Sequence, residues 1–245
     1  MNIYLAGTAC LAKHPYLLEE SSYILESFAY VKPWQIEILK SRKGFILDSG
    51  AFTFMNGRNA GRIEEYAESY GKFVKENDVK HFVELDVDDI VGIERYKEVN
   101  ERLEYIAGRK AMPVFHKRRG LEWWKKKTKE NPYVCYGGVA VDIRAMKKMD
   151  FDAMPEMIKV AHCNGATVHG LGFTQTKKYD RIRFDSVDST TWTMAGRMGI
   201  MCFFNGTRMQ QFHSTEKGKK MVEPEKLMIF NYREWLKYQR YMEGK

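Results

Sequence analysis

The sequence lacks the features that mark secreted, membrane-spanning or metal-clipped proteins. Its 4 cysteines are scattered over 245 residues, so neither a C-x-x-C metal clip nor a disulfide framework is predicted. No signal peptide precedes the first predicted strand, and no apolar run approaches the roughly 18 residues of a membrane span. No linker rich in proline, glycine or serine divides the chain. These absences favour one cytoplasmic domain spanning residues 1–245, without a membrane partner.

The composition is that of a folded chain with an excess of positive charge. Hydrophobic residues make up 44% and aromatic residues 13% of the sequence, which excludes disorder, and the formal net charge is +8. A polyanionic partner is therefore permitted. Basic residues and two tryptophans share one segment, and a further arginine follows later: Lys117, Arg118, Arg119, Trp123, Trp124, Lys125 and Arg197. This mixture is typical of a nucleic-acid track, although a solvated helix with inward tryptophans explains the segment equally well.

Short apolar runs alternate with helical periodicity along the whole chain. The predicted strands are 2–6, 44–47, 81–85, 111–115, 133–136, 167–171, 181–184 and 199–204. The segment 15–28 is predicted to be helical, and a long final helix is predicted to begin at Pro224. Eight strands alternating with helices predict a single (β/α)8 barrel of the triosephosphate-isomerase type with a C-terminal helix. The alternative is an open doubly wound sheet, but Gly7 does not begin a G-x-G-x-x-G fingerprint.

Acids, a histidine and glycines follow the predicted strands, at the ends that meet at one rim of a barrel. They are Asp48, Asp86, His116, Gly137, Gly172 and Asp185. Asp185 and Asp188 are the first candidates for a reactive carboxylate, but Asp188 alternatively caps a helix beginning near Trp192.

Three kinds of function fit these residue types. Metal-assisted hydrolysis would use the aspartates with His116 or His169, yet no H-x-H or H-E-x-x-H pair is present. Carboxylate catalysis at a sugar C1′ needs one acid as nucleophile and a second that transfers protons. A binding protein would use the cleft only to hold a base. We favour the second, because Asp86 could accept the N–H groups of a guanine-like base while the backbone of Gly137 and Gly138 approaches its carbonyl.

Six motifs in matching order resemble the tRNA-guanine transglycosylases, and more closely their shorter relatives in phages and bacteria that insert 7-deazaguanines into DNA. Residues 48–53 (DSGAFT) resemble D-S-G-G/S-F-Q, and residues 85–86 fall where the family has its base-recognising aspartate. Residues 113–116 (PVFH) lie where the family has V-Q-G, and residues 137–141 (GGVAV) are similar to G-G-L-A-V-G-E. Residues 169–172 (HGLG) match L-M-G-V-G, and residues 184–186 (FDS) match F-D-C/S.

The resemblance implies a role for each matching residue. Asp185 would be the nucleophile and Asp48 the proton-handling acid. The base would be held by Asp86 or its rival Asp88, and by Ser49, His116, Gly137, Gly138, His169 and Gly170. The reaction implied is exchange of guanine in a nucleic acid for a 7-deazaguanine such as a preQ0-like base, without an external cofactor or metal.

The chain also departs from the family. The C-x-C-x-x-C…H zinc module and the appended RNA-binding domain are missing, so DNA becomes the preferred substrate and tRNA the alternative. His116 stands in place of a glutamine and Asp142-Ile143 in place of G-E, which leaves the accepted base open. An accessory protein or a homodimer remains possible as partner, and a non-catalytic nucleic-acid-binding subunit is the competing non-enzyme interpretation.

Overall fold

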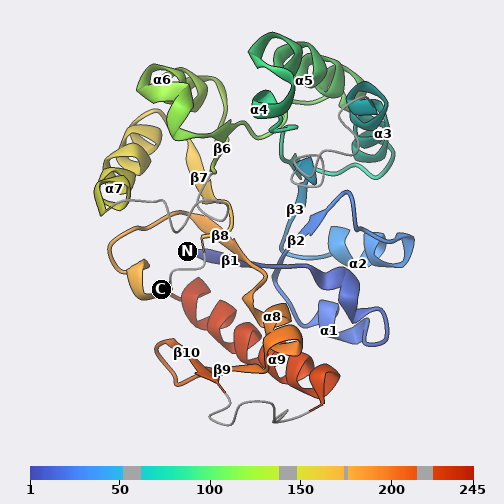
Figure 1. Ribbon diagram of the computed structural model, residues 1–245, viewed down its shortest axis with the longest axis vertical. Coiled ribbons are helices and arrows are strands. Elements are labelled where there is room, and N and C mark those ends of the chain that lie inside the picture. The colour runs from blue at the N-terminus through green and yellow to red at the C-terminus, as the bar shows by residue number, and fades with distance from the viewer. Residues whose placement is uncertain (52–61, 138–147, 174–175, 214–222) are drawn as a thin grey trace.

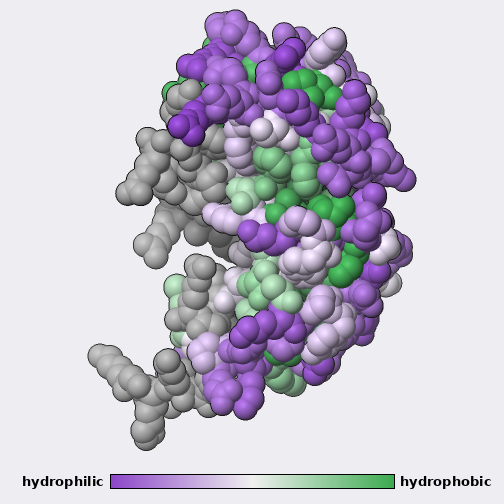
Figure 2. Space-filling model, turned by 90° about the vertical axis from the view of Figure 1, so that its right-hand side faces the viewer, coloured by the Kyte–Doolittle hydropathy of each residue, from purple (hydrophilic) through white to green (hydrophobic). Residues whose placement is uncertain are grey.

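The computed structural model describes residues 1–51, 62–137, 148–173, 176–213 and 223–245. A ring of helices surrounds a parallel sheet, with the N-terminus near the centre and helix α9 crossing below it (Figure 1). Hydrophilic side chains cover most of the face seen in Figure 2, and a band of apolar surface crosses its middle. None of the helices in the described ranges combines the length and apolar composition needed to cross a bilayer.

Eight strands form one all-parallel sheet in the order β4-β3-β2-β1-β8-β7-β6-β5. Their bounds are β1 Asn2–Ala6, β2 Tyr23–Ser27, β3 Gly44–Asp48, β4 His81–Phe82, β5 Val114–Phe115, β6 Tyr133–Tyr136, β7 Thr167–Gly170 and β8 Ser186–Ser189. The sheet curls so that its edge strands approach, and a single parallel bridge between Val83 and Met112 joins them. Two further strands, β9 Ile200–Phe204 and β10 Met209–His213, form a separate antiparallel hairpin.

Helices follow most strands and cover the outer face of the sheet. The α-helices are α1 Tyr16–Glu19, α2 Ile36–Lys40, α3 Ile63–Glu76, α4 Asp88–Val91, α5 Ile93–Ala107, α6 Gly120–Glu130, α7 Lys148–Cys163, α8 Thr191–Met198 and α9 Pro224–Glu243. Short 3-10 turns are η1 Thr8–Leu11, η2 Pro33–Gln35, η5 Lys117–Arg119 and η6 Thr176–Lys178. Gly108 ends α5 in a left-handed conformation (φ 70°) that suits glycine.

The prediction of an α/β fold with eight parallel strands and a C-terminal helix is confirmed, but over the described residues the sheet is curled without forming a closed barrel, and three strand assignments differ from the structure. Residues 23–27 form strand β2 instead of continuing a helix, because the apolar run 23–25 is only three residues long and a run this short does not distinguish a buried strand from a buried helix. Residues 200–204 lie outside the large sheet. The seventh predicted strand is displaced along the chain, since β8 begins at Ser186, two residues after the predicted strand ends.

The inside of the curled sheet is filled by alternate side chains from its strands. Tyr4, Tyr23, Ile46, Val114 and Cys135 belong to one buried cluster on this inner side. Their chain neighbours point outward into the helices, as Leu5 and Ile24 do. Burial on both faces explains why the strands read as continuous apolar runs.

Helix α9 fastens the beginning of the sheet through one buried amide. The Nε2 of Gln239 donates to the carbonyls of Ile3 (2.7 Å) and Tyr23 (2.9 Å), and its Oε1 accepts from the Ser22 amide (2.9 Å). The side chain is 1% exposed. These bonds satisfy backbone groups that have no water within reach.

Replacing Gln239 should therefore destabilise the whole sheet. Gln239→Leu keeps the bulk but removes the acceptor of the Ser22 amide and one donor to each of two carbonyls, of which that of Tyr23 keeps the Ser21 hydroxyl. We therefore expect a loss of about 2–4 kcal/mol in the free energy of unfolding, measured by urea denaturation. Arg240→Leu, on the exposed face of the same turn, is the matched control and should change stability by less than about 1 kcal/mol. Equal losses in the two variants would contradict the assigned role of Gln239.

Candidate functional site

Asp48 is the last residue of β3 and faces the carboxyl-terminal rim of the sheet. Its Oδ2 accepts a hydrogen bond from the Gly50 amide (2.9 Å), and Gly50 adopts φ 73° to make that turn. Burial raises the pKa of Asp48 to about 6, and although the Gly50 amide lowers it, the charges of Asp188 and Asp86 raise it further. Asp48 can therefore exist in either protonation state near neutral pH.

Asp188 lies within β8, opposite Tyr4 of β1 in the parallel ladder. It is 7% exposed, and its Oδ1 accepts from the Gly172 amide (2.6 Å) and contacts His169 Nε2 (3.3 Å). It does not cap α8, whose first amide, that of Thr191, is bound instead by the Ser189 hydroxyl. The alternative interpretation of Asp188 as a helix cap is therefore wrong.

A chain of buried hydrogen bonds runs from the interior of the sheet to Asp188. His169 Nδ1 contacts the Ser186 hydroxyl (2.7 Å), which contacts the Tyr133 hydroxyl, and Tyr133 in turn bonds Tyr4. Burial raises the pKa of Tyr4 to about 12, so this phenol stays neutral. A carboxylate at Asp188 requires a donor at His169 Nε2, so His169 Nδ1 accepts from the Ser186 hydroxyl. In this series of bonds Ser186 then accepts from Tyr133, and Tyr133 accepts from Tyr4.

This chain of bonds changes the role expected of His169. Its side chain is fully buried and both ring nitrogens have partners, so the structure places it behind Asp188 and away from any incoming base. Gly170 follows in β7, where an added Cβ would lie 2.7 Å from the Phe184 ring, so its lack of a side chain serves packing. Ser49 is also buried, and its carbonyl accepts from Tyr66 (2.6 Å).

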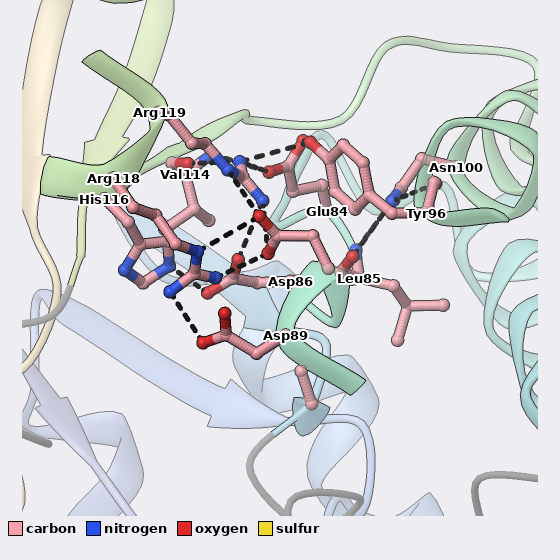
Figure 3. A network of polar contacts seen from close by, with 12 residues as sticks. Glu84, Leu85, Asp86, Asp89, Tyr96, Asn100, Val114, His116, Arg118 and Arg119 are labelled. Carbon is pink, nitrogen blue, oxygen red and sulfur yellow. Dashed lines mark hydrogen bonds and ion pairs between the residues drawn. The ribbon is translucent and has the colours of Figure 1, made fainter. Parts of the chain in front are cut away.

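Asp86 and His116 approach the same rim from the ends of β4 and β5 (Figure 3). His116 Nε2 is hydrogen-bonded to Asp86 Oδ2, and Asp86 Oδ1 accepts from Arg119 Nη2 (3.0 Å). The two side chains remain 21% and 16% exposed. An added Cβ on Gly137 would lie 3.0 Å from the His116 ring, so the backbone of Gly137 lies directly against it. Gly138 lies outside the described residues.

Arg119 is the buried centre of this network, which corrects its predicted role in nucleic-acid binding. Its guanidinium is 3% exposed and pairs with Glu84 (2.6 Å), Asp86 (3.0 Å) and Asp88 (3.0 Å) (Figure 3). It also lies 4.5 Å from the centre of the Tyr96 ring. A side chain so enclosed cannot reach a phosphate. Glu84 was not anticipated, and only its two-residue spacing from Asp86 in the segment between β4 and α4 could have indicated it.

Asp88 is occupied by arginines and is not open to a base. Burial alone would raise its pKa, but hydrogen bonds from Arg118 and Arg119 outweigh that effect and lower it to about 2. Arg118 also pairs with Asp89 (2.6 Å). Of the two predicted base-reading acids, the more accessible is Asp86.

Asp185 is not brought to the rim at all. It directly precedes β8, where its carbonyl accepts from the Asn2 amide (2.9 Å) at the amino-terminal end of the sheet. Its carboxylate accepts from the Val168 amide (2.7 Å) and pairs with His162 (2.9 Å). The predicted meeting of Asp48 with Asp185 is wrong because the strand begins later than its apolar pattern suggests, and Asp188 takes that place.

The predicted basic track is also largely neutralised. Trp124 is buried and donates to the Met157 carbonyl (2.8 Å), and Lys125 pairs with Glu122 (2.9 Å). Lys117 is exposed in η5. Arg197 lies in α8, and its side chain lies outside the described residues. The interpretation of α6 as a solvated helix with an inward tryptophan holds for Trp124.

The rim therefore combines a carboxylic acid of raised pKa, a buried and oriented carboxylate, and a third carboxylate held by a histidine and an arginine. Such a set can transfer a proton, attack an electrophilic carbon and accept hydrogen bonds from a planar ligand. Within the described ranges, no group of three or more His, Cys, Asp or Glu side chains could hold a metal ion. No family model matches the chain, and no curated protein matches it either.

The raised pKa of Asp48 predicts a pH-dependent gain in stability when the charge is removed. Its folded-state pKa of about 6 exceeds its ordinary value of 3.8. The folded protein therefore retains the proton as pH rises through 4–6, and stability falls over that window. Asp48→Asn should raise the free energy of unfolding by on the order of 2 kcal/mol at pH 8 and by little at pH 4.

The measurement is urea denaturation of both proteins at the two pH values. Glu65→Gln, on the exposed face of α3, is the control and should show no such difference. A loss of stability in Asp48→Asn at pH 8 would contradict the burial of an ionisable group at this position.

Proposed function

We propose that the chain is a nucleic-acid guanine transglycosylase that exchanges a guanine, preferably in DNA, for a 7-deazaguanine base. The observation that carries the proposal is the pairing of Asp48, whose pKa is raised to about 6, with Asp188, a buried carboxylate oriented by a hydrogen-bonded histidine. The motifs that resemble the guanine transglycosylases support the same reaction, except residues 184–186, whose Asp185 lies at the opposite end of the sheet. We further propose that the curled sheet works as a complete (β/α)8 barrel, with its substrate at the carboxyl-terminal rim.

The reaction would proceed by two displacements at the sugar. Asp188 attacks C1′ of a flipped-out guanosine, forming an ester bond to C1′ as the C1′–N9 bond breaks. Protonated Asp48 donates its proton to the departing guanine. The incoming 7-deazaguanine loses its N9 proton to ionised Asp48 and then displaces Asp188 from C1′. Atoms and charges balance without an oxidant or external cofactor.

The base would lie against Asp86, whose carboxylate keeps partial exposure while His116 and Arg119 fix its plane. Two parallel N–H bonds from the guanine edge would suit that fixed carboxylate. The Gly137 amide is not available to the base, because it donates to the Phe115 carbonyl (2.8 Å) and the His116 ring lies against this glycine. Arg119 keeps this acidic site stable by balancing three carboxylates.

Exchange of labelled guanine tests the activity. The chain is incubated with guanine-containing DNA or tRNA and radiolabelled guanine, and label in each polymer is counted. Asp188→Asn should abolish incorporation, whereas Asp185→Asn, whose side chain lies at the opposite end of the sheet, should retain a rate within about threefold of the unmodified protein.

The outcomes separate the competing functions. Label in tRNA alone would replace DNA by tRNA as substrate. Binding of the polymer without incorporation of labelled guanine would support a non-catalytic accessory subunit. Cleavage of the polymer that is lost when a chelator is added would support a metal-dependent hydrolase. Full activity in Asp188→Asn would remove the proposed nucleophile.

The hydrogen-bonded chain behind Asp188 predicts that Ser186 positions the nucleophile. Ser186→Ala removes the donor to His169 Nδ1, so the ring can adopt the tautomer that offers no N–H to Asp188. We expect kcat for exchange to fall roughly tenfold, which is about 1.4 kcal/mol. KM for the incoming base should not change, because Ser186 is buried behind Asp188.

Ser186→Thr is the conservative control, because it restores a hydroxyl and should recover most of the rate. A recovered rate in Ser186→Thr would show that the lost hydrogen bond, and not altered packing, slows Ser186→Ala. Circular dichroism and thermal unfolding would detect a change in packing. A normal kcat in Ser186→Ala would show that the orientation of His169 does not matter for Asp188.

A further inference from the structure

A pocket of about 760 Å³ lies under the β9–β10 hairpin, outside the rim described above. Its walls come from η6, the first residue of α8, both hairpin strands and Trp235 of α9. Thr191 in its wall follows Asp188 by three residues, so the pocket lies beside the carboxyl-terminal end of β8. Figure 1 shows the hairpin next to α9, away from α3 to α5.

The described residues that line the pocket include basic side chains and give it a positive charge. No carboxylate is present among the described residues that line it, whereas Lys177, Arg208 and His213 are. Lys177 and Arg208 form no ion pair within the part of the chain that the structure describes. This distinguishes them from Arg118 and Arg119, whose charges are already balanced by acids. Cations without partners are available to phosphates.

The hairpin also presents exposed aromatic rings. The ladder pairs Phe203 with Gln210 and Met201 with Phe212, so these four side chains share one face. Phe203 is 40% and Phe212 is 44% exposed. Phe212 lines the pocket together with Lys177 and Arg208. Exposed aromatic rings near cations are the combination that proteins use to bind single-stranded nucleic acid, where bases stack and phosphates contact the charges.

The hairpin is held rigidly enough to serve as a platform. On the opposite face, Cys202 is buried against α9. Asn231 accepts from the Cys202 amide (2.8 Å) and donates to the Ile200 carbonyl (3.0 Å), and Glu234 accepts from the Phe204 amide (2.9 Å). Side chains of α9 thus take the place of a neighbouring strand along β9 and fix the hairpin on the body of the protein.

We propose that this surface binds the sugar-phosphate backbone and flanking bases of the nucleic-acid strand whose guanine enters the rim. Lys177 and Arg208 contact phosphates, and Phe203 and Phe212 stack on bases. The inference rests on the proposed function for the identity of the strand. A protein segment pairing with β10 would be the other occupant, but the cations of the pocket wall, which has no carboxylate among its described residues, favour a polyanion, as does the net charge of +8.

Fluorescence anisotropy with a labelled, guanine-free oligonucleotide tests the surface independently of base exchange. Lys177→Ala/Arg208→Ala should reduce the slope of log K against log salt by about 1.4, since each phosphate contact on a single strand contributes about 0.7. Phe203→Ala/Phe212→Ala should weaken binding about tenfold or more and leave that slope unchanged.

Lys97→Ala is the matched control, because Lys97 is an exposed lysine paired with Glu94 on α5 (3.1 Å), and it should leave affinity and slope as they were. Affinity and slope equal to those of the unmodified protein in the Lys177/Arg208 variant would overturn the inference. So would an unmodified protein that binds no oligonucleotide, single- or double-stranded, which would point to a protein partner. If binding responds to these substitutions as expected but no labelled guanine is exchanged, the nucleic-acid-binding surface would be supported and the proposed transglycosylase activity would be contradicted.

Discussion

The alternation of side chains along parallel strands decides which polar groups of this chain can meet. Every strand of the large sheet runs the same way, so the side chains at the carboxyl ends converge, and those at the amino ends face the opposite surface. Asp48 and Asp188 share the first group, while Asp185 belongs to the second. Asp185 and Asp188 are only three residues apart, yet Asp185 forms an ion pair at the amino-terminal end of the sheet and Asp188 lies toward the carboxyl-terminal rim.

Several carboxylates at one rim repel one another, and Arg119 offsets much of this repulsion. One buried guanidinium balances Glu84, Asp86 and Asp88, which lets these acids remain together in a partly buried place. Asp48 and Asp188 lie outside its hydrogen-bond reach, and their mutual repulsion contributes to the raised pKa of Asp48. The same rim thus contains acids that are paired with Arg119 and, outside that network, Asp48, whose pKa is raised to about 6.

The sequence predicted the type of sheet and the general place of the site better than the individual contacts. Apolar runs identify β1, β3, β4, β6 and β7, and the polar residues at the ends of β3 and β4 correctly mark the rim at Asp48 and Asp86. The strand β2 was missed because its apolar run is too short to be distinguished from part of a buried helix. Arg119 could not be distinguished from Arg118 by composition, since only the tertiary structure shows which of two adjacent arginines turns inward. The role of Ser186 depends on Tyr133 and Tyr4, which are distant in sequence and adjacent only inside the sheet.

The amide of Gln239 has a consequence for how the chain acquires its structure during synthesis. It closes hydrogen bonds on Ile3 and Tyr23 across separations of 236 and 216 residues. These carbonyls belong to the first two strands to leave the ribosome, yet their partner is made more than two hundred residues later. At about 5–20 residues per second, strands β1 and β2 wait on the order of ten seconds or longer with those groups open. Until α9 emerges, water can take the place of Gln239 at these carbonyls, so the first two strands reach their final hydrogen bonding only when synthesis is nearly complete.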